Sequence, residues 1–168
     1  MLSLLLVAVL ATLLLRTTVA GASSSLACGT WSVVPGPSTL SQDILHGVAA
    51  SSGRNVWAAG SSYSGGSVQT LIEHWDSKHW SIVPSGGGNA LYGVAVLSKN
   101  NAWTVGNVNS SPPQTLIKHW DGTTWSIIPS PSPGSVNNYL YSVAALSANN
   151  IWAVGSYTSA ALPRWAAL

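Results

Sequence analysis

Histidine residues are the first candidates for metal or acid–base chemistry in this chain. His74 and His119 occupy equivalent positions in two similar segments and follow Glu73 and Lys118. A metal site needs three or four converging ligands, and neither Cys nor a carboxylate recurs in register beside both histidines. We therefore interpret the two histidines as structural residues of strands, and we predict no metal site and no cofactor.

The four acidic residues suggest no catalytic pair. Asp76 and Asp121 stand at equivalent positions in turns, where an Asx hydrogen bond to the backbone explains them. Hydrolysis of a glycosidic bond needs two carboxyl groups about 5–10 Å apart, and no spacing here implies such a pair. The sequence has no Gly-x-Ser-x-Gly, phosphate-loop or dinucleotide-binding motif. We predict no catalytic residue and no enzymatic activity.

Tryptophan dominates the aromatic residues, with nine Trp, five Tyr and no Phe. Nearly all of the tryptophans return at equivalent positions of a repeated pattern. A large apolar residue that returns in every repeat is explained by packing between repeats, where each burial stabilises by about 2–3 kcal/mol. Stacking on a glycan is the alternative. The structural repeat positions are Trp31, Trp57, Trp75, Trp80, Trp103, Trp120, Trp125 and Trp152.

Four short sequence blocks recur in the same order with a period of about 47 residues, which indicates a repeat architecture. The block Thr-Leu-Ile-x-His-Trp-Asp begins at Thr70 and again at Thr115. The blocks are rich in β-branched and aromatic residues and are bounded by Gly, Pro, Asn or Ser, which is typical of strands. We expect strands over residues 45–51, 55–61, 69–75 and 79–83, then 91–97, 101–107, 114–120 and 124–128, then 140–146 and 150–156, after an isolated strand over 31–34.

The repeated residues resemble a kelch repeat. Residues 75–80 and 120–125 each contain Trp-Asp, a few further residues and a Trp, like the second half of a kelch repeat, and residues 94–106 resemble its first half with a single Gly in place of Gly-Gly. The chain is also similar to exported bacterial tandem-repeat proteins, usually treated as kelch-like or galactose-oxidase-like β-propellers, to which no activity is assigned as a class. The resemblance, which covers residues 28 to about 157, and the four strands per repeat imply an all-β fold: a partial β-propeller of four-stranded antiparallel blades.

The N-terminal segment differs from the repeats. Residues 2–15 are apolar and uncharged but fewer than the roughly 20 needed to span a bilayer, and Ala20-Gly21-Ala22 is a plausible cleavage site. We expect an N-terminal hydrophobic (signal) helix and export, with the protein secreted or at the cell surface; an uncleaved membrane anchor is the alternative. The predicted organisation is a signal peptide over 1–22, a linker over 23–30, a partial β-propeller over 31–160 with blades 45–83 and 91–128 and a half blade 140–156, and an irregular tail over 161–168.

The charge and the cysteine content limit the classes of binding partner that we expect. Only 6% of residues are charged and the formal net charge is +2, which excludes a nucleic-acid footprint. Cys28 is the single cysteine, so no disulfide forms within the chain. It is a small buried residue at the domain edge, or it pairs with a cysteine outside this chain. Lipidation is a further alternative, because residues 25–28 faintly resemble a lipoprotein lipobox. We expect no membrane contact beyond the N-terminal signal or anchor.

Loops that vary in length between repeats are the expected binding surface. Labelling the strands of each blade a to d, these are the d–a loops over 36–44, 85–90 and 131–138, and the b–c loops over 62–68 and 107–113. We expect an exported, non-catalytic binding or scaffold module that recognises protein or polysaccharide there. A truncated fragment of an extracellular carbohydrate-active propeller enzyme and a non-functional remnant are the alternatives. The candidate binding residues are Tyr63, Asn89, Asn107, Asn109, Asn137 and Asn138.

The predicted array holds about two and a half blades, whereas a closed propeller has at least four. Open end blades expose apolar faces and strand edges, so we expect self-association through them. Two explanations stay open: the chain is truncated, or copies of it complete a ring together.

Overall fold

The structure, a computed structural model, describes residues 30–37 and 42–160. The chain divides into two units, Met1–Val33 and Val34–Leu168, and every strand belongs to the second. The predicted signal peptide with its helix, nearly all of the predicted linker including Cys28, and the predicted tail over 161–168 lie outside the described residues.

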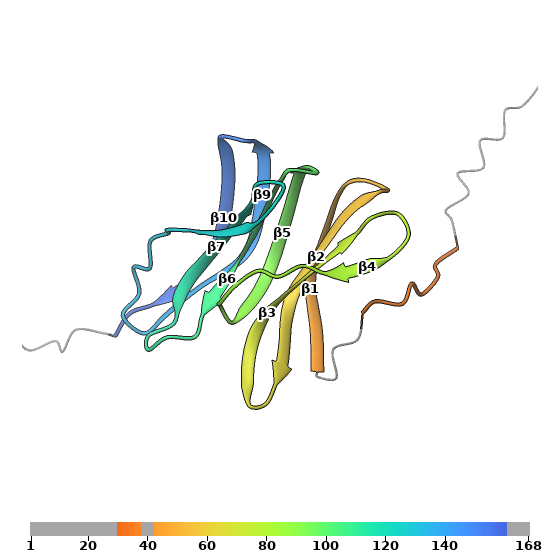
Figure 1. Ribbon diagram of the computed structural model, residues 1–168. Helices are drawn as coiled ribbons and strands as arrows, with labels where there is room; N and C mark the ends of the chain where they lie inside the picture. Colours follow the sequence, from red (N-terminus) through yellow and green to blue (C-terminus); the bar gives the residue numbers. More distant parts are fainter. Residues whose placement is uncertain (1–29, 38–41, 161–168) are drawn as a thin grey trace, which may run out of the picture. The chain divides into compact units, whose positions relative to one another are not determined.

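The described residues form ten strands in three antiparallel sheets, and neighbours along the chain are neighbours in each sheet (Figure 1). The described residues contain no helix. The all-β, antiparallel part of the prediction is therefore confirmed. The first sheet comprises β1 (Gln42–Ser52), β2 (Asn55–Ser64), β3 (Ser67–Trp75) and β4 (Trp80–Ile82); the second comprises β5 (Ala90–Ser98), β6 (Asn101–Val108), β7 (Gln114–Trp120) and β8 (Trp125–Ile128); the third comprises β9 (Asn137–Ser147) and β10 (Asn150–Thr158).

The strands lie close to their predicted positions. β7 has the predicted bounds, whereas β1 and β9 each begin three residues before the predicted start. The extra residues are mostly polar, and they belong to the strands because their backbones pair with the far ends of β2 and β10: Gln42 with Tyr63, and Asn137 with Thr158. Apolar patterning marks only the packed part of a strand, and backbone pairing continues beyond it.

One glycine near the end of the second strand shapes every sheet in the same way. A Cβ added at Gly106 would lie 1.9 Å from the carbonyl oxygen of Ala90 on the first strand, and Gly60 and Gly155 are equally crowded. The pairing register between first and second strand shifts nearby in all three sheets. The glycine that recurs in each repeat thus permits close backbone approach at a β-bulge.

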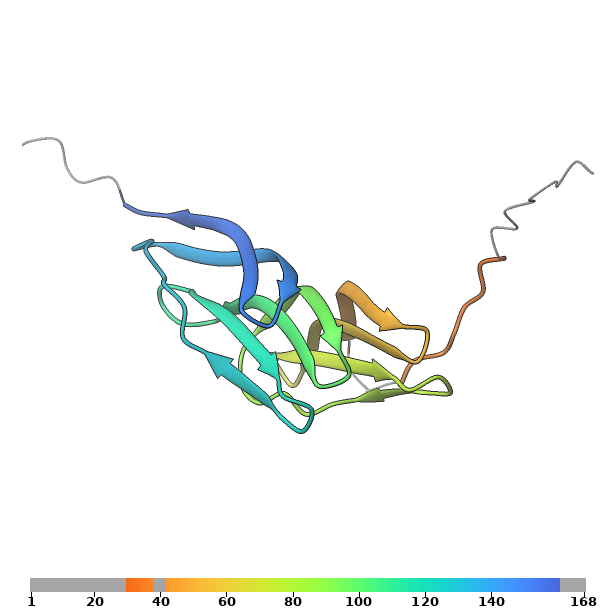
Figure 2. The same cartoon turned by 90° about the horizontal axis from the view of Figure 1, so that it is seen from above.

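The three sheets stack along their first strands, β1 against β5 and β5 against β9 (Figure 2). The spacing is tight: a Cβ at Gly47 would lie 3.1 Å from the carbonyl oxygen of Tyr92, and one at Gly93 would lie 3.1 Å from that of Tyr141. The rings of His46, Tyr92 and Tyr141 follow one another across the sheets, with centroids 5.2 and 5.6 Å apart. Small residues at these positions therefore set how closely the sheets approach.

The main core lies between the first and second sheets. The indole of Trp57 on β2 is 1% exposed, and its ring centre lies 5.1 Å from that of Trp120 and 5.2 Å from that of Trp125 in the second sheet. Burial of a large aromatic side chain is among the strongest single contributions to such a core. The other buried members of this cluster are Ala59, Ile72, Leu91, Ala102 and Leu116.

The connections between strands are divided between two ends of the sheets. The β2–β3 and β6–β7 connections lie at one end, together with the starts of β5 and β9, and the tight turns β1–β2, β5–β6 and β9–β10 lie at the other (Figure 1). We call the first of these the loop end. It carries the connections that vary in length between repeats.

The predicted isolated strand over 31–34 is absent, since residues 30–37 contain no strand. A strand requires the backbone of a partner, and no strand of the described residues pairs with this segment. Gly36 instead lies beside β3: a Cβ there would be 3.4 Å from the carboxylate of Glu73.

Candidate functional site

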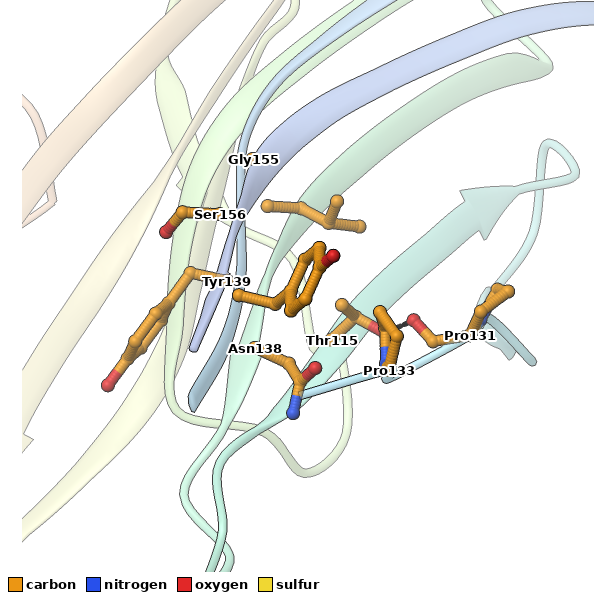
Figure 3. A pocket seen from close by; sticks show the side chains of 9 residues that line it. Thr115, Pro131, Pro133, Asn138, Tyr139, Gly155 and Ser156 are labelled. Atoms are coloured by element: carbon orange, nitrogen blue, oxygen red, sulfur yellow. Dashed lines mark hydrogen bonds between the residues drawn. The ribbon is translucent and has the colours of Figure 1, made fainter. Parts of the chain in front are cut away.

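A pocket of about 170 Å³ lies at the loop end, between the second and third sheets. Figure 3 shows Thr115 at the start of β7 and the prolines Pro131 and Pro133 of the β8–β9 connection, which face the β9–β10 hairpin. No lining residue is charged, so the pocket suits a neutral ligand. The lining residues are Thr115, Pro131, Pro133, Asn138, Tyr139, Leu140, Gly155, Ser156 and Tyr157.

Asn138 fixes the floor of this pocket. Its Oδ1 accepts a hydrogen bond of 2.6 Å from the Gly134 backbone nitrogen, and its Nδ2 donates to the carbonyl oxygens of Gly134 and Pro113, both at 2.9 Å. The side chain thereby ties the β8–β9 connection to the β6–β7 connection and is itself fully buried. A buried amide with its hydrogen bonds made is a rigid support.

Thr115 fixes the opposite wall. Its Oγ1 donates to the carbonyl oxygen of Pro131 at 3.0 Å and lies 2.7 Å from Ser130 Oγ. Its backbone nitrogen also donates to Ser132 Oγ at 3.0 Å. These contacts hold the proline-containing connection against β7 and preform the pocket.

The corresponding space between the first and second sheets is filled by β7 itself. A Cβ at Gly88 would lie 2.7 Å from Leu116 Cδ2 and 2.9 Å from Thr70 Cγ2. Thr70 is the repeat equivalent of the pocket residue Thr115, and Leu116 is 1% exposed. The pocket is therefore open because, among the described residues, no third strand follows β10.

Lys118 on β7 is fully buried and holds the connection that precedes β5. Its Nζ donates to the carbonyl oxygens of Ser85, Gly86 and Gly87, the last at 2.7 Å. Burial lowers the pKa of Lys118 from 10.5 to about 8. Three carbonyl oxygens around one ammonium make a structural anchor, and no ligand reaches this lysine.

Glu73 stands at the same repeat position in β3 and is also buried. Burial raises the pKa of its carboxyl, and the charge of Asp43 raises it further. An acid and a base therefore take the same place under equivalent connections of successive sheets. No role was predicted for either residue from the sequence. The alternation of side chains along a strand could have indicated their burial. Glu73 lies on the same sheet face as the buried Leu71, and Lys118 on the same face as the buried Leu116.

The predicted binding residues divide into three groups. Tyr63 and Asn109 are exposed at the loop end, and Asn89 and Asn137 are half-buried. Asn107 and Asn138 are buried, and Asn138 also lines the pocket. Tyr157, which lines the pocket and is 63% exposed, was missed.

The recurring histidines belong to a repeated polar cluster. Asn55 Oδ1 accepts hydrogen bonds from Trp57 Nε1 at 3.1 Å and from His74 Nε2 at 2.8 Å, and the two rings lie 4.3 Å apart. Burial lowers the pKa of His74, although the charge of Asp76 raises it. In the second sheet Asn101, Trp103 and His119 repeat the arrangement. Each histidine is thus held by its own sheet.

The predicted structural tryptophans differ in burial. Trp57 and Trp125 are buried, and Trp75, Trp80, Trp103 and Trp120 are half-buried. Trp152 is 66% exposed, although its Nε1 still donates to Asn150 at 2.7 Å. Trp31 belongs to the N-terminal unit and lies in no strand. Burial follows the presence of a facing sheet.

The acids in the turns take up the expected Asx geometry. Asp76 Oδ1 accepts from the backbone nitrogens of Lys78 and His79, both at 2.8 Å, and Asp121 accepts from those of Thr123 and Thr124. Hydrogen bonds from the backbone nitrogens lower the pKa of both carboxyls, that of Asp121 to about 2. In the described part of the chain no three His, Cys, Asp or Glu residues gather as metal ligands would.

Comparison with known proteins adds no relative: no family model, no curated protein and no solved structure matches this chain. Residues 30–37 and 42–160 also include no helix with the length and apolar character needed to cross a membrane. The candidate site is therefore argued from the chain's own residues.

Proposed function

We propose that this chain is an exported, non-catalytic binding module, built as part of a β-propeller, whose loop end binds a neutral polysaccharide. The observation that carries the proposal is the pocket of about 170 Å³ at the loop end. It offers the exposed ring of Tyr157, two prolines, a threonine and a serine, and no charge. Apolar surfaces with a few placed polar groups are typical of sites for neutral polar ligands.

Three features support the propeller architecture. Successive four-stranded sheets carry their strands in chain order, their first strands adjoin, and equivalent residues make equivalent contacts. The kelch-like sequence repeats agree with this arrangement. Export is proposed from the apolar segment over residues 2–15 alone.

The absence of catalysis is proposed from the positions of the acids. Asp76 and Asp121 are engaged by the backbone of their own turns. Glu73 is buried beside Gly36. Neither these three acids nor Asp43, the fourth acidic residue, lines the pocket, so the pocket lacks the two carboxyl groups that a glycosidase places around its substrate.

Affinity electrophoresis in gels that contain neutral polysaccharides (a β-glucan, a mannan and a galactan) tests the proposal. We expect retardation by at least one of them, and Tyr157→Ala to weaken it about two- to tenfold through loss of one aromatic contact. Ile127→Ala is the control, because Ile127 is an exposed residue of β8 that does not line the pocket. Equal loss in both variants, or no retardation by any neutral polysaccharide, contradicts the proposal.

A second candidate function, recognition of an extended protein segment, is favoured by the edge of β10. Among the described residues β10 pairs with β9 alone, and the adjacent pocket corresponds to the space that Leu116 of β7 fills in the preceding pair of sheets. An added strand with a leucine at that register would both pair with β10 and fill the pocket.

A labelled peptide with the sequence of residues 114–121 tests this second function by fluorescence anisotropy. We expect the peptide to bind and its Leu116→Asp version to bind at least about tenfold more weakly, because a charge would enter an apolar pocket. Equal binding of the two peptides excludes recognition by strand addition.

A further inference from the structure

The residues that form the contact between the first and second sheets have repeat equivalents on the outer faces of the first and third sheets. Trp57 and Ala59 of β2 project toward the second sheet and are 1% and 0% exposed. Trp57 contacts Trp120 and Trp125 there, and Leu91 on β5 is fully buried in the same cluster. A second strand on one sheet thus packs against the first, third and fourth strands of the next.

The outer face of the first sheet carries the repeat equivalents of the second-sheet residues that receive Trp57 and Ala59. No other sheet of the described residues packs against this face. Leu45 and Val48 on β1 are 47% and 68% exposed, whereas Leu91, the repeat equivalent of Leu45, is fully buried. Leu45 and Val48 line a hollow of about 260 Å³ together with His46, Gly47, Ala58 and Trp80. Trp80 is the repeat equivalent of the buried Trp125.

The outer face of the third sheet carries the repeat equivalents of the residues that project from the first sheet into this contact. Trp152 and Val154 on β10 are the repeat equivalents of Trp57 and Ala59. They are 66% and 63% exposed, in place of 1% and 0%. The same residue types that form the interior contact therefore stand at the two ends of the stack, one half at each end.

We propose that these two faces bind each other between two copies of this chain, so that β9–β10 of one copy packs on β1–β4 of the next and two copies close a ring. The proposal rests on the β-propeller architecture of the proposed function. The described residues of each copy form three sheets, so two copies bring six, within the four to eight blades of typical propellers, whereas three copies would exceed that range. Head-to-tail contacts that close in this way give a defined oligomer.

The chemistry of the two faces agrees with pairing. The residues that would meet, Trp152 and Val154 on one face and Leu45, Val48 and Trp80 on the other, carry no charge. Contact among these five residues would bury no charge, and an aromatic side chain would enter an apolar hollow. Interface centres have this composition, with large aromatic residues as anchors.

Light scattering after size-exclusion chromatography of the purified protein tests the proposal, with Trp152→Lys disabling one face and Val48→Asp the other. Both residues are largely exposed, so circular dichroism should show unchanged strand content. We expect twice the monomer mass for the parent protein and the monomer mass for each variant. The dissociation constant of the dimer should rise about tenfold or more in each variant. Ile127→Lys, at an exposed residue outside both faces, is the control and should leave the mass unchanged.

Mixing the two variants makes the test specific for a head-to-tail contact. In a mixed pair one interface joins the intact β10 face of the Val48→Asp copy to the intact β1 face of the Trp152→Lys copy. We therefore expect the equimolar mixture to recover the double mass. A parent protein that stays monomeric, one that grows into open polymers, or a mixture that stays monomeric overturns the proposal. Because Tyr157 lies outside both faces, the polysaccharide test can fail while this one succeeds.

Discussion

Trp57 on β2 and Trp125 on β8 meet edge to face, with ring centroids 5.2 Å apart and planes at 84°. The two residues belong to different sheets and are 68 positions apart in the chain, so their contact joins one repeat to the next. Edge-to-face aromatic pairs contribute about 0.5–1.5 kcal/mol beyond the area they bury. The contact explains why tryptophan recurs at both repeat positions.

Asn55 should stabilise the first sheet through its shared acceptor oxygen. Asn55→Ala removes the acceptor for Trp57 Nε1 and His74 Nε2 in a buried setting, and we expect a loss of about 1–3 kcal/mol in the free energy of unfolding. Asn150→Ala is the matched control, because Asn150 is exposed and accepts only from Trp152; its cost should stay below about 0.5 kcal/mol. Urea denaturation of both variants measures the difference, and equal costs would contradict the assignment.

Gly106 should tolerate no side chain. A Cβ there would lie 1.9 Å from the Ala90 carbonyl oxygen, so Gly106→Ala must separate β5 from β6, and we expect a cost of about 3 kcal/mol or more. Gly53→Ala is the control: nothing lies within 4 Å of its added Cβ, and the change should alter stability by less than about 1 kcal/mol. Thermal denaturation that shows similar melting temperatures for the two variants would refute the role of the bulge.

Lys118 should make stability depend on pH. Its pKa is about 8 in the folded protein and 10.5 when unperturbed. Between these pH values the unfolded chain binds more protons, so the free energy of unfolding rises as the pH is raised above about 8, by at most about 1.4 kcal/mol per pH unit. Urea denaturation between pH 7.5 and pH 9.5 should show this slope in the parent protein.

The Lys118→Met variant should lose that slope, since it carries no titrating group at the position. Lys99→Met, at an exposed lysine, should keep it. A slope that persists in Lys118→Met would show that another group titrates on unfolding and would contradict the lowered pKa of Lys118.

Most of the fold could be predicted from local sequence because each strand carries its own signals. Alternating apolar residues, bounding Gly and Asn, and recurrence of each block placed the strands of all three sheets. The segment over 31–34 resembles a fourth strand equally well, yet it forms none. Local pattern shows that a segment suits a strand, whereas the presence of a partner strand is a property of the whole array.

The site was predicted less well, because composition does not say which way a side chain points. Asn107 and Asn109 stand in the same Asn-rich connection, but the first is buried and the second is exposed. Asn138 was predicted to contact a ligand; it lines the pocket, and its amide also ties two connections together through hydrogen bonds that the sequence does not reveal. The pocket residue Tyr157 gave no signal in the sequence, since it occupies a position where the preceding repeat has Val108.

A double-mutant cycle across Trp57 and Trp125 tests most directly that successive repeats pack as sheets through their tryptophans. We predict that Trp57→Leu and Trp125→Leu couple by about 0.5–1.5 kcal/mol in the free energy of unfolding. The pair Trp57→Leu and Tyr157→Ala, which share no contact, should add within about 0.5 kcal/mol. Additive behaviour of Trp57 and Trp125 as well would contradict the stacking of the first sheet on the second.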